Sequence, residues 1–169
     1  RALFNAQIDY DVVPGDCLDA MEVRDGRATV GQAAYRALVV PKAEYLSESV
    51  CGSLETLARR GFRVLFADGA PAGMAEAEVA PVDTLPEKLR ELVFVSLAEP
   101  FPLLRARRVC RDDATVYLLF NESAVDVFDG EMRLADSGFF RRVDLLSEEV
   151  TTGHAPGGLV AMRVVLQAG

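Results

Sequence analysis

The segment at residues 35–71 constrains the fold of this chain more than any other, because it predicts a strand, a helix and a second strand in direct succession. Residues 37–40 form a continuous apolar run, which is typical of a strand covered on both faces, as in a parallel sheet. The run "FRVLFAD" at residues 62–68 predicts a second strand of the same kind. Two such strands joined by a helix form a βαβ unit, which packs as a right-handed crossover.

The sequence between these two strands carries helix signals at both ends. Ser47 is expected to be the N-cap, and Glu48 lies in the first turn, where a carboxylate interacts favourably with the helix dipole. Gly61 is expected at the C′ position, after a basic last turn. Apolar residues recur at helical spacing at Val50, Leu54, Leu57 and Ala58. The pattern therefore predicts one amphipathic helix.

Polar residues follow both predicted strands, at the edge of an open parallel sheet where ligands usually bind. The two loops are "VVPKAEY" at 39–45 and "FADGAPAG" at 66–73. Lys42, Glu44, Asp68 and the Gly69 backbone are therefore predicted to form a loop or interface site. The alternative is that these residues are polar only because loops face water.

Several shorter signals complete the first part of the chain. Residues 10–13 predict a short strand, and Asp25-Gly26 between two alternating runs predicts a hairpin turn. Residues 69–86 are rich in Ala, Pro and Gly and predict a loop or lid with little regular structure. A short helix with Pro86 in its first turn is expected over residues 86–93.

The character of the sequence changes after about residue 95. The segments that follow are β-rich, are separated by Asn, Asp, Gly and Ser, and contain no long helical pattern. Strands in succession after an α/β section indicate a second domain. We therefore predict an α/β domain at residues 1–97 and a small antiparallel, sandwich-like β domain at residues 98–169, an α/β plus all-β organisation.

The charge of the chain excludes some partners. Its 169 residues carry 18 Lys and Arg against 26 Asp and Glu, a formal net charge of -8. An acidic surface repels phosphate backbones, so no nucleic-acid partner is expected. No apolar run approaches the roughly 20 residues of a membrane helix, so no membrane partner is expected. The sequence begins at Arg1 rather than Met, as expected for a processed protein or an excised fragment, and the lack of a visible secretory signal favours the cytoplasm.

Motifs for cofactor, metal and nucleophilic chemistry are absent from the sequence. No phosphate-binding glycine motif follows a strand, so no nucleotide or flavin cofactor is expected. Cys17, Cys51 and Cys110 are too widely spaced for a clustered metal site and are expected to be mostly buried thiols. Cys51 falls within the predicted helix, and His154, the sole histidine, falls in a predicted turn. We therefore predict no catalytic, cofactor-binding or metal-binding residue.

Acidic pairs give no specific signal for glycoside hydrolysis, which needs two carboxylates held a few ångströms apart. The obvious pairs, Asp9/Asp11 and Glu148/Glu149, are more simply solvated strand or turn residues. The "NES" stretch at 121–123 predicts an Asn-led turn, and it matches only the minimal Asn-x-Ser pattern for glycosylation.

Two stretches of sequence resemble parts of large bacterial glycoside hydrolases. The stretch "YRALVVPKAEYLSESVCGSLETLARRGFRVLFADGAP" resembles their glutamine-amidotransferase-like, flavodoxin-like accessory domain, of which the β-galactosidase trimerisation domain is a relative. "VYLLFNES", with "RRVDLLSEEVT" further along, resembles the β-sandwich segment that follows this domain in rhamnosidase-like glycosidases, although Val143 replaces a Tyr of the family pattern. The resemblance implies a flavodoxin-like parallel sheet with flanking helices, followed by a small antiparallel β domain. It also implies that the first strand, expected before "QIDYDVV", is missing.

The function that this resemblance implies is architectural. In that family the catalytic carboxylates lie in a barrel domain, and the accessory domain packs on that domain or makes an oligomer contact. The implied partners are the catalytic domain of the same polypeptide and further copies in a homo-oligomer. Two alternatives stay open: a carbohydrate-binding module, which would need a row of exposed aromatic side chains, and a Cys-dependent amidotransferase-like hydrolase, which would need a reactive Cys beside His154.

Overall fold

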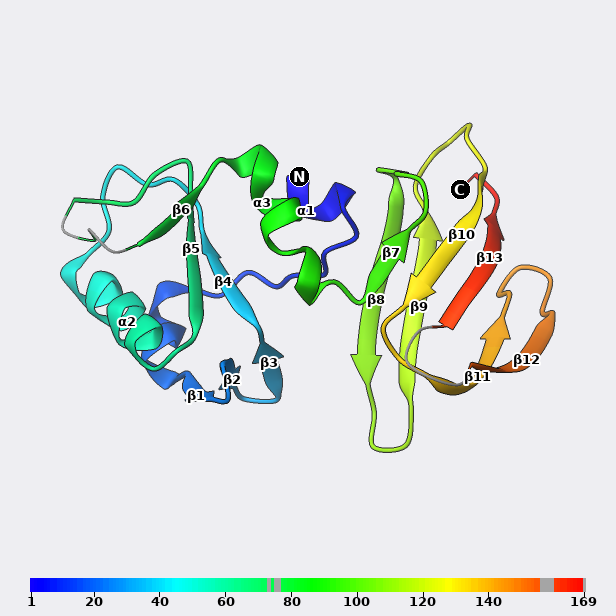
Figure 1. The fold of residues 1–169 in the computed structure, drawn as a ribbon, viewed down its shortest axis with the longest axis horizontal. Helices are drawn as coiled ribbons and strands as arrows, with labels where there is room; N and C mark the ends of the chain where they lie inside the picture. Colours follow the sequence, from blue (N-terminus) through cyan, green and yellow to red (C-terminus); the bar gives the residue numbers. More distant parts are fainter. Residues whose placement is uncertain (73, 75–76, 156–159, 169) are drawn as a thin grey trace. The chain divides into compact units, whose positions relative to one another are not determined.

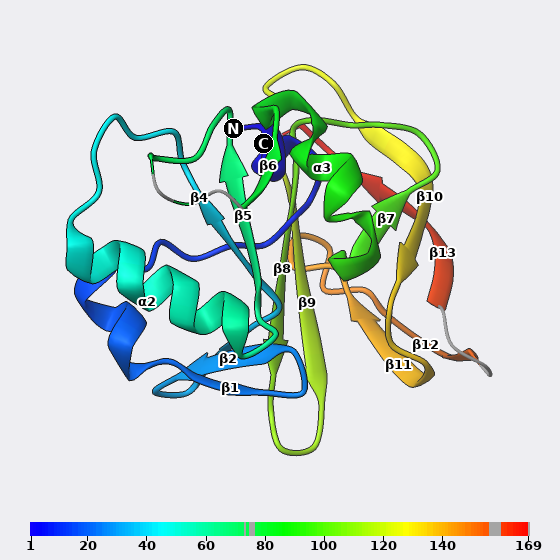
Figure 2. The ribbon, with the colours of Figure 1, turned by 60° about the vertical axis from the view of Figure 1, so that its left-hand side comes forward.

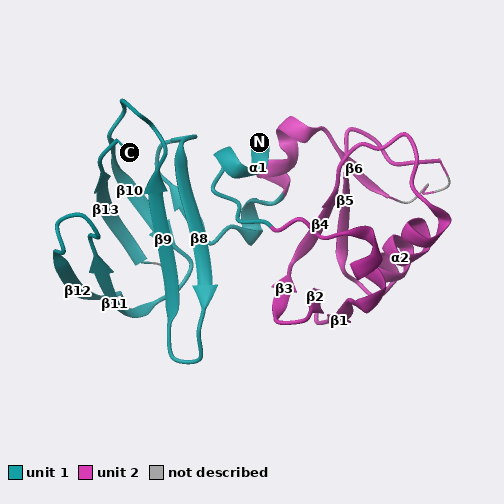
Figure 3. Ribbon diagram, turned by 180° about the vertical axis from the view of Figure 1, so that it is seen from behind, with its two compact units in different colours: residues 1–10, 89–169 teal, residues 11–88 magenta. Residues whose placement is uncertain are grey.

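A computed structural model describes residues 1–72, 74, 77–155 and 160–168 of the chain. Figure 1 shows the helices and strands, and Figure 3 shows the two compact units into which the chain divides. One unit comprises residues 11–88, and the other comprises residues 1–10 together with residues 89–169. Each unit has a hydrophobic core of its own, so each is described separately.

The 11–88 unit begins with a 3-10 turn and an antiparallel meander. The 3-10 helix η1 (Gly15–Ala20) leads into β1 (Glu22–Arg24), β2 (Arg27–Val30) and β3 (Ala33–Tyr35), which pair in that order. The residues between β1 and β2, Asp25 and Gly26, have φ of 51° and 70°, the positive values of a tight two-residue turn. The predicted hairpin is therefore confirmed, whereas the strand predicted at residues 10–13 is wrong.

The predicted βαβ unit is present at residues 35–71. β4 (Ala37–Val40), α2 (Glu48–Arg59) and β5 (Arg63–Ala67) follow one another, and β4 pairs with β5 in parallel. β6 (Glu78–Ala80) adds a third parallel strand on the other side of β5. The central strand β5 is buried over residues 64–67, whereas the edge strand β4 is buried only at Val40, so coverage on both faces holds for β5 alone. Figure 2 shows α2 lying alongside β5.

Both ends of α2 have the predicted caps. Ser47 Oγ accepts a hydrogen bond from a backbone amide of the first turn at 3.3 Å. Gly61 has φ of 84°, and its amide and the next one donate to two carbonyls of the last turn, which would otherwise lack partners. Leu54 and Leu57 are buried in the core of this unit, but Ala58 is exposed, so the apolar stripe is narrower than predicted.

The predicted flavodoxin-like fold is wrong. The described residues form thirteen strands in small and mostly antiparallel sheets, and the parallel sheet contains only β4, β5 and β6. A flavodoxin-like sheet has about five parallel strands joined by crossover helices. Here the chain before β4 turns back through two-residue loops, which join antiparallel strands only. The βαβ pattern is therefore a local feature and not part of a large parallel sheet.

The described residues of the second unit form three small antiparallel sheets, as expected for the β-rich sequence after residue 95. After the short helix α1 (Ala2–Asn5), the three-stranded sheet consists of β7 (Val95–Leu97), β10 (Phe128–Leu134) and β13 (Val160–Leu166), in the order β13-β10-β7. The two hairpins are β8 (Leu104–Cys110) with β9 (Thr115–Asn121), and β11 (Gly138–Val143) with β12 (Val150–Ala155).

The core of this unit lies between the β8–β9 hairpin and the three-stranded sheet. Tyr117 and Leu119 of β9 and Phe140 of β11 pack against buried residues from β7, β8, β10 and β13. Those buried residues are Val95, Leu104, Phe128, Met132, Leu134, Val160 and Val164. Inward side chains of two sheets thus share one core, which is the packing of a β-sandwich. Each sheet therefore has one inner face and one outer face.

The segment between the two β-rich parts is more regular than predicted. The predicted loop at residues 69–86 contains β6, the 3-10 helix η2 (Val82–Thr84) and the start of α3 (Leu85–Lys88), while its residues 73 and 75–76 lie outside the described part. The pairing of β6 with β5 gives this sequence its regular structure. The helix expected at 86–93 is divided between α3 and the 3-10 helix η3 (Arg90–Leu92).

The predicted domain boundary at residues 97/98 stays a prediction.

Candidate functional site

Asp68 and Gly69 lie directly after β5, where a loop site was predicted, and Asp68 holds that loop in place. Its amide donates to the Ala80 carbonyl at 2.9 Å, and its Oδ1 accepts from the Val82 amide at 2.9 Å. These bonds join the end of β5 to the chain that leaves β6. Gly69 has φ of 142°, a conformation that residues with a side chain rarely adopt. Both residues therefore have a structural role in shaping the loop.

Lys42 and Glu44 lie on the loop after β4, and both are exposed. The structure records no hydrogen bond or ion pair between either of them and any other described residue. All four predicted residues thus follow strands of one parallel sheet, but no bond connects Lys42 or Glu44 to Asp68. Whether they act together at a loop or interface site stays a prediction.

The cysteines are more accessible than expected. Cys17 and Cys51 are half-buried, and Cys110 is exposed at the end of β8, so the expectation of mostly buried thiols is wrong. The end of a strand meets solvent, and this position outweighs the usual preference of Cys for burial. His154 lies on β12 rather than in a turn, and its ring lies against Phe139 with centroids 4.4 Å apart.

The "NES" stretch forms the Asn-led turn that was predicted, between β9 and β10. Asn121 is 2 % exposed, and its Nδ2 donates to the carbonyls of Asp126 and Leu166. Its Oδ1 accepts from the Ser123 amide at 2.9 Å, and Ser123 Oγ accepts from the Asp126 amide at 2.8 Å. A buried side chain with all these bonds is not accessible for glycosylation, so Asn121 has a structural role.

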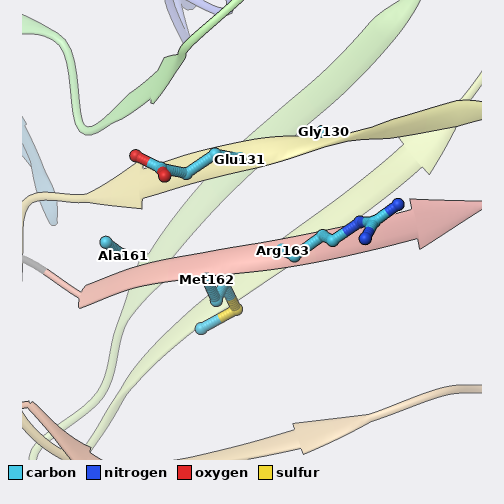
Figure 4. A pocket seen from close by; sticks show the side chains of 5 residues that line it. All are labelled: Gly130, Glu131, Ala161, Met162 and Arg163. Carbon is cyan, nitrogen blue, oxygen red and sulfur yellow. The ribbon is translucent and has the colours of Figure 1, made fainter.

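Neither a metal centre nor an enclosed pocket stands out among the described residues. Within them, no group of three or more His, Cys, Asp and Glu side chains is arranged to hold a metal ion. Two shallow, open depressions lie on the described surface. One of about 230 Å³ over β10 and β13 is lined by the residues in Figure 4, and one of about 510 Å³ lies between η1 and α2. Ligand pockets usually measure about 300–1,000 Å³ and enclose most of the ligand, which neither open depression does. The charged residues of the depression in Figure 4, Glu131 and Arg163, already pair with Arg133 and Asp129.

A polar cluster joins β8, β9 and the connection between β10 and β11. The Arg108 guanidinium donates from Nε and Nη2 to the two carboxylate oxygens of Asp136 at 3.1 Å each, and it lies 4.4 Å from the centre of the Phe94 ring. The Tyr117 hydroxyl also donates to Asp136. Cys110 Sγ accepts from Arg108 Nη1 at 2.9 Å. The cluster therefore fastens both strands of the hairpin to the rest of the unit.

The ionisation of this cluster favours a structural role. Burial, together with the hydrogen bond to Asp136, raises the pKa of Tyr117 to about 12. The hydrogen bond to Asp136 also raises the pKa of Arg108. Both groups are therefore fully protonated at neutral pH, whereas an efficient general acid or base has a pKa near the working pH. The arrangement therefore suits a stable ion pair and hydrogen bond better than it suits proton transfer.

The outer face of the β8–β9 hairpin carries a row of apolar side chains on β9 that are in contact with solvent. We call it the β9 face, and it consists of Val116, Leu118 and Phe120 on β9 with their cross-strand partners Val109, Arg107 and Arg105 on β8. The three β9 side chains are 42 %, 52 % and 57 % exposed in chain order. A contiguous exposed apolar surface of this kind is typical of an interaction site.

The outer face of the opposite sheet has a different composition. On β10 and β13 the outward residues Asp129 and Arg163 form an ion pair at 2.7 Å, and Glu131 pairs with Arg133 at 3.0 Å. That face is charged, as expected for a sheet surface in water. The two sheets of one sandwich therefore differ in their outer faces: β9 presents three apolar side chains in a row, whereas β10 and β13 present mostly charged ones.

Ion pairs flank the apolar part of the β9 face. Arg105 Nε donates to Glu122 at 2.7 Å, and Arg107 Nη1 donates to Asp9 at 3.3 Å. The Arg105 guanidinium also lies 3.9 Å from the centre of the Phe4 ring. Each charge of the face therefore has an opposite charge beside it, and the N-terminal residues contribute to its border.

Sequence reasoning did not single out the β9 face. The stretch "TVYLLFN" has apolar or aromatic residues on both faces of the strand, which is typical of a strand covered on both sides. The sequence contains a signal in the neighbouring strand "LRARRVC", whose alternating Arg105 and Arg107 indicate an outward face. The face can be recognised only when the pairing of β8 with β9 is known, because that pairing places Arg105 opposite Phe120 and Arg107 opposite Leu118.

The described residues form a mostly antiparallel β protein of two compact units. No family model, curated protein or solved structure matches the chain. Among the helices of the described part, none has the length and apolarity needed to cross a membrane.

Proposed function

We propose that this chain is a non-catalytic accessory region of a bacterial glycoside hydrolase and that it acts by contact with another folded protein surface. The observation that carries the proposal is the β9 face, which is apolar and half-exposed in a chain of net charge -8. Burying one fully exposed Leu or Phe side chain contributes about 1.5–3 kcal/mol. The partner is the catalytic domain of the same polypeptide or a further copy of the chain.

The positions of the polar residues support a non-catalytic role. Asp68 bonds to the backbone of a loop, Asn121 bonds within a buried turn, and Asp136 bonds to Arg108 and Tyr117. Each of these groups is therefore engaged in holding the fold. The glycoside hydrolase setting is supported by the resemblance of "VYLLFNES", in which Asn121 and Ser123 form the turn after β9.

The two alternative functions have less support. A carbohydrate-binding surface needs a row of aromatic rings with open faces. Among the six residues of the β9 face, Phe120 is the single aromatic one, and the Phe4 ring at the border is covered by the Arg105 guanidinium. The centre of the face is aliphatic, which suits a protein partner better than a sugar. A Cys-dependent hydrolase needs an activated thiol with a base in reach. Cys51 is half-buried within α2, and the exposed Cys110 accepts a hydrogen bond from Arg108, whereas the recorded contact of His154 is with Phe139.

The proposal is tested by turnover and binding measurements on the purified chain. Aryl glycosides, glutamine and a set of soluble polysaccharides are each mixed with the wild-type chain and with the variants Cys51→Ala and His154→Ala. We expect no turnover above a protein-free control and no heat of polysaccharide binding. Turnover that either variant abolishes would establish a catalytic function instead, and saturable polysaccharide binding that Phe120→Ala removes would establish a carbohydrate-binding module.

A further inference from the structure

We infer that the β9 face binds the β9 face of a second copy of the chain, which gives a two-fold symmetric dimer. The inference rests on the proposed function, since it names the partner of the same face. A two-fold contact uses one surface patch on both copies, so that patch must be complementary to itself in charge and in shape. The β9 face meets both requirements.

The charges of the face are balanced. Its two arginines, Arg105 and Arg107, pair with Glu122 and Asp9, so two positive side chains face two negative ones. The whole chain carries a net charge of -8, and two copies therefore repel each other over most of their surface. A locally neutral, apolar face is the place where two such copies can approach. A strongly charged partner gains little from a face whose charges are already paired.

The side chains of the face also match one another in size. Leu118 is the middle residue of β9 (Thr115–Asn121) and the middle member of the apolar row. A two-fold axis near Leu118 places Val116 of one copy opposite Phe120 of the other. Small and large side chains then meet on both sides of the axis, which favours close packing.

The area of the face predicts a weak dimer. Two strands of seven residues each measure roughly 24 Å by 10 Å, and the Phe4 ring, which lies against Arg105, adds to the border of this surface. Stable interfaces bury about 800 Å² on each partner. The face is smaller than that, so we expect a concentration-dependent equilibrium between monomer and dimer.

The test is analytical ultracentrifugation of the 169-residue chain over a concentration series. We expect the wild-type mass to rise from monomer to dimer. Leu118→Glu places a charge at the centre of the contact, which should weaken the dimer at least tenfold, about the effect of losing a central contact residue. Val150→Glu is the matched control, because Val150 is also an apolar strand residue of this unit and is 49 % exposed, and it should leave the dimer unchanged. Circular dichroism checks that both variants are folded.

A charge-reversal pair identifies the face directly. Leu118→Glu and Leu118→Lys should each be monomeric, and an equimolar mixture should form a heterodimer, since opposite charges then meet near the axis. A wild-type chain that stays monomeric at every concentration, or a Leu118→Glu variant that still dimerises, overturns this inference. Neither result decides the proposed function, which the turnover and polysaccharide measurements test separately.

Discussion

Asp136 accepts hydrogen bonds from side chains of two neighbouring strands, Arg108 on β8 and Tyr117 on β9. These bonds raise the pKa of Arg108, and burial together with them raises the pKa of Tyr117. The two donors hold this carboxylate in place. At the scale of residues, the polar side chains of this chain therefore mainly stabilise turns and strand contacts.

The first prediction concerns the ionisation of Tyr117. Its pKa is raised from 10.0 to about 12, so the folded protein disfavours the phenolate relative to the unfolded chain. The stability that this group contributes is fully present below pH 10 and is lost as the pH rises through about 12. Alkaline titration followed by tyrosinate absorbance should show one late phenol in the wild type that is missing in Tyr117→Phe. A difference titration centred near the ordinary Tyr value would contradict the raised pKa.

The second prediction concerns Gly153, which lies opposite Phe140 in the β11–β12 hairpin. A Cβ atom at Gly153 would lie 2.5 Å from Cζ of Phe140, and the Phe140 ring packs against the core. Gly153→Ala should therefore lower the free energy of unfolding by about 1–3 kcal/mol, as overpacked sites do. Chemical denaturation measures the loss.

A second background isolates the cause of this loss. In Phe140→Leu the ring is absent, so adding Gly153→Ala should cost less than it does in the wild type. An equal cost in both backgrounds would show that the backbone, and not the Phe140 ring, disfavours a side chain at this position.

Local sequence patterns determined several elements of the chain. The caps at Ser47 and Gly61, the Asp25-Gly26 turn and the Asn-led turn at Asn121 all depend on residues within a few positions of one another, and all are present. β6 was missed because its three residues gain regular structure only by pairing with β5. At the scale of elements, prediction therefore succeeded where the contacts are local.

The third prediction concerns the loop that Asp68 holds after β5. Asp68→Ala removes the acceptor of the Val82 amide and should lower the free energy of unfolding by about 0.5–1.5 kcal/mol. Asp68→Asn keeps an oxygen at Oδ1 and should retain most of that stability. Thermal unfolding of the three proteins measures the difference. Equal losses in both variants would mean that the negative charge, rather than the hydrogen bond, stabilises the loop.

At the scale of the whole molecule, the net negative charge and the β9 face have opposite effects on the association of two copies. The net charge of -8 opposes association of two copies, while the neutral apolar face favours it. Salt screens the repulsion between the two negatively charged copies, but it does not remove the favourable free energy of burying apolar surface.

The fourth prediction follows from this balance of forces. Raising the NaCl concentration from about 0.01 M to about 1 M shortens the Debye length from about 30 Å to about 3 Å. The dimer should therefore become tighter as salt is added, which sedimentation equilibrium measures through the dissociation constant. Val150→Glu serves again as the control for a change of one charge elsewhere in the unit. A dimer that weakens in high salt would indicate ion pairs across the contact rather than apolar burial.

The sequence by itself determined the βαβ unit at residues 35–71, the turns, and the β-rich character of the second part, because period, caps and turn residues act over short distances. The tertiary structure decided how the strands group into sheets and which face each strand turns to solvent. "TVYLLFN" has apolar residues on both sides, so only pairing with β8 and packing on the core distinguish inward Tyr117 and Leu119 from outward Leu118 and Phe120. Whether a side chain is buried depends on residues that are distant in the chain. For this reason local sequence patterns predicted neither the grouping of the strands into small sheets nor the β9 face.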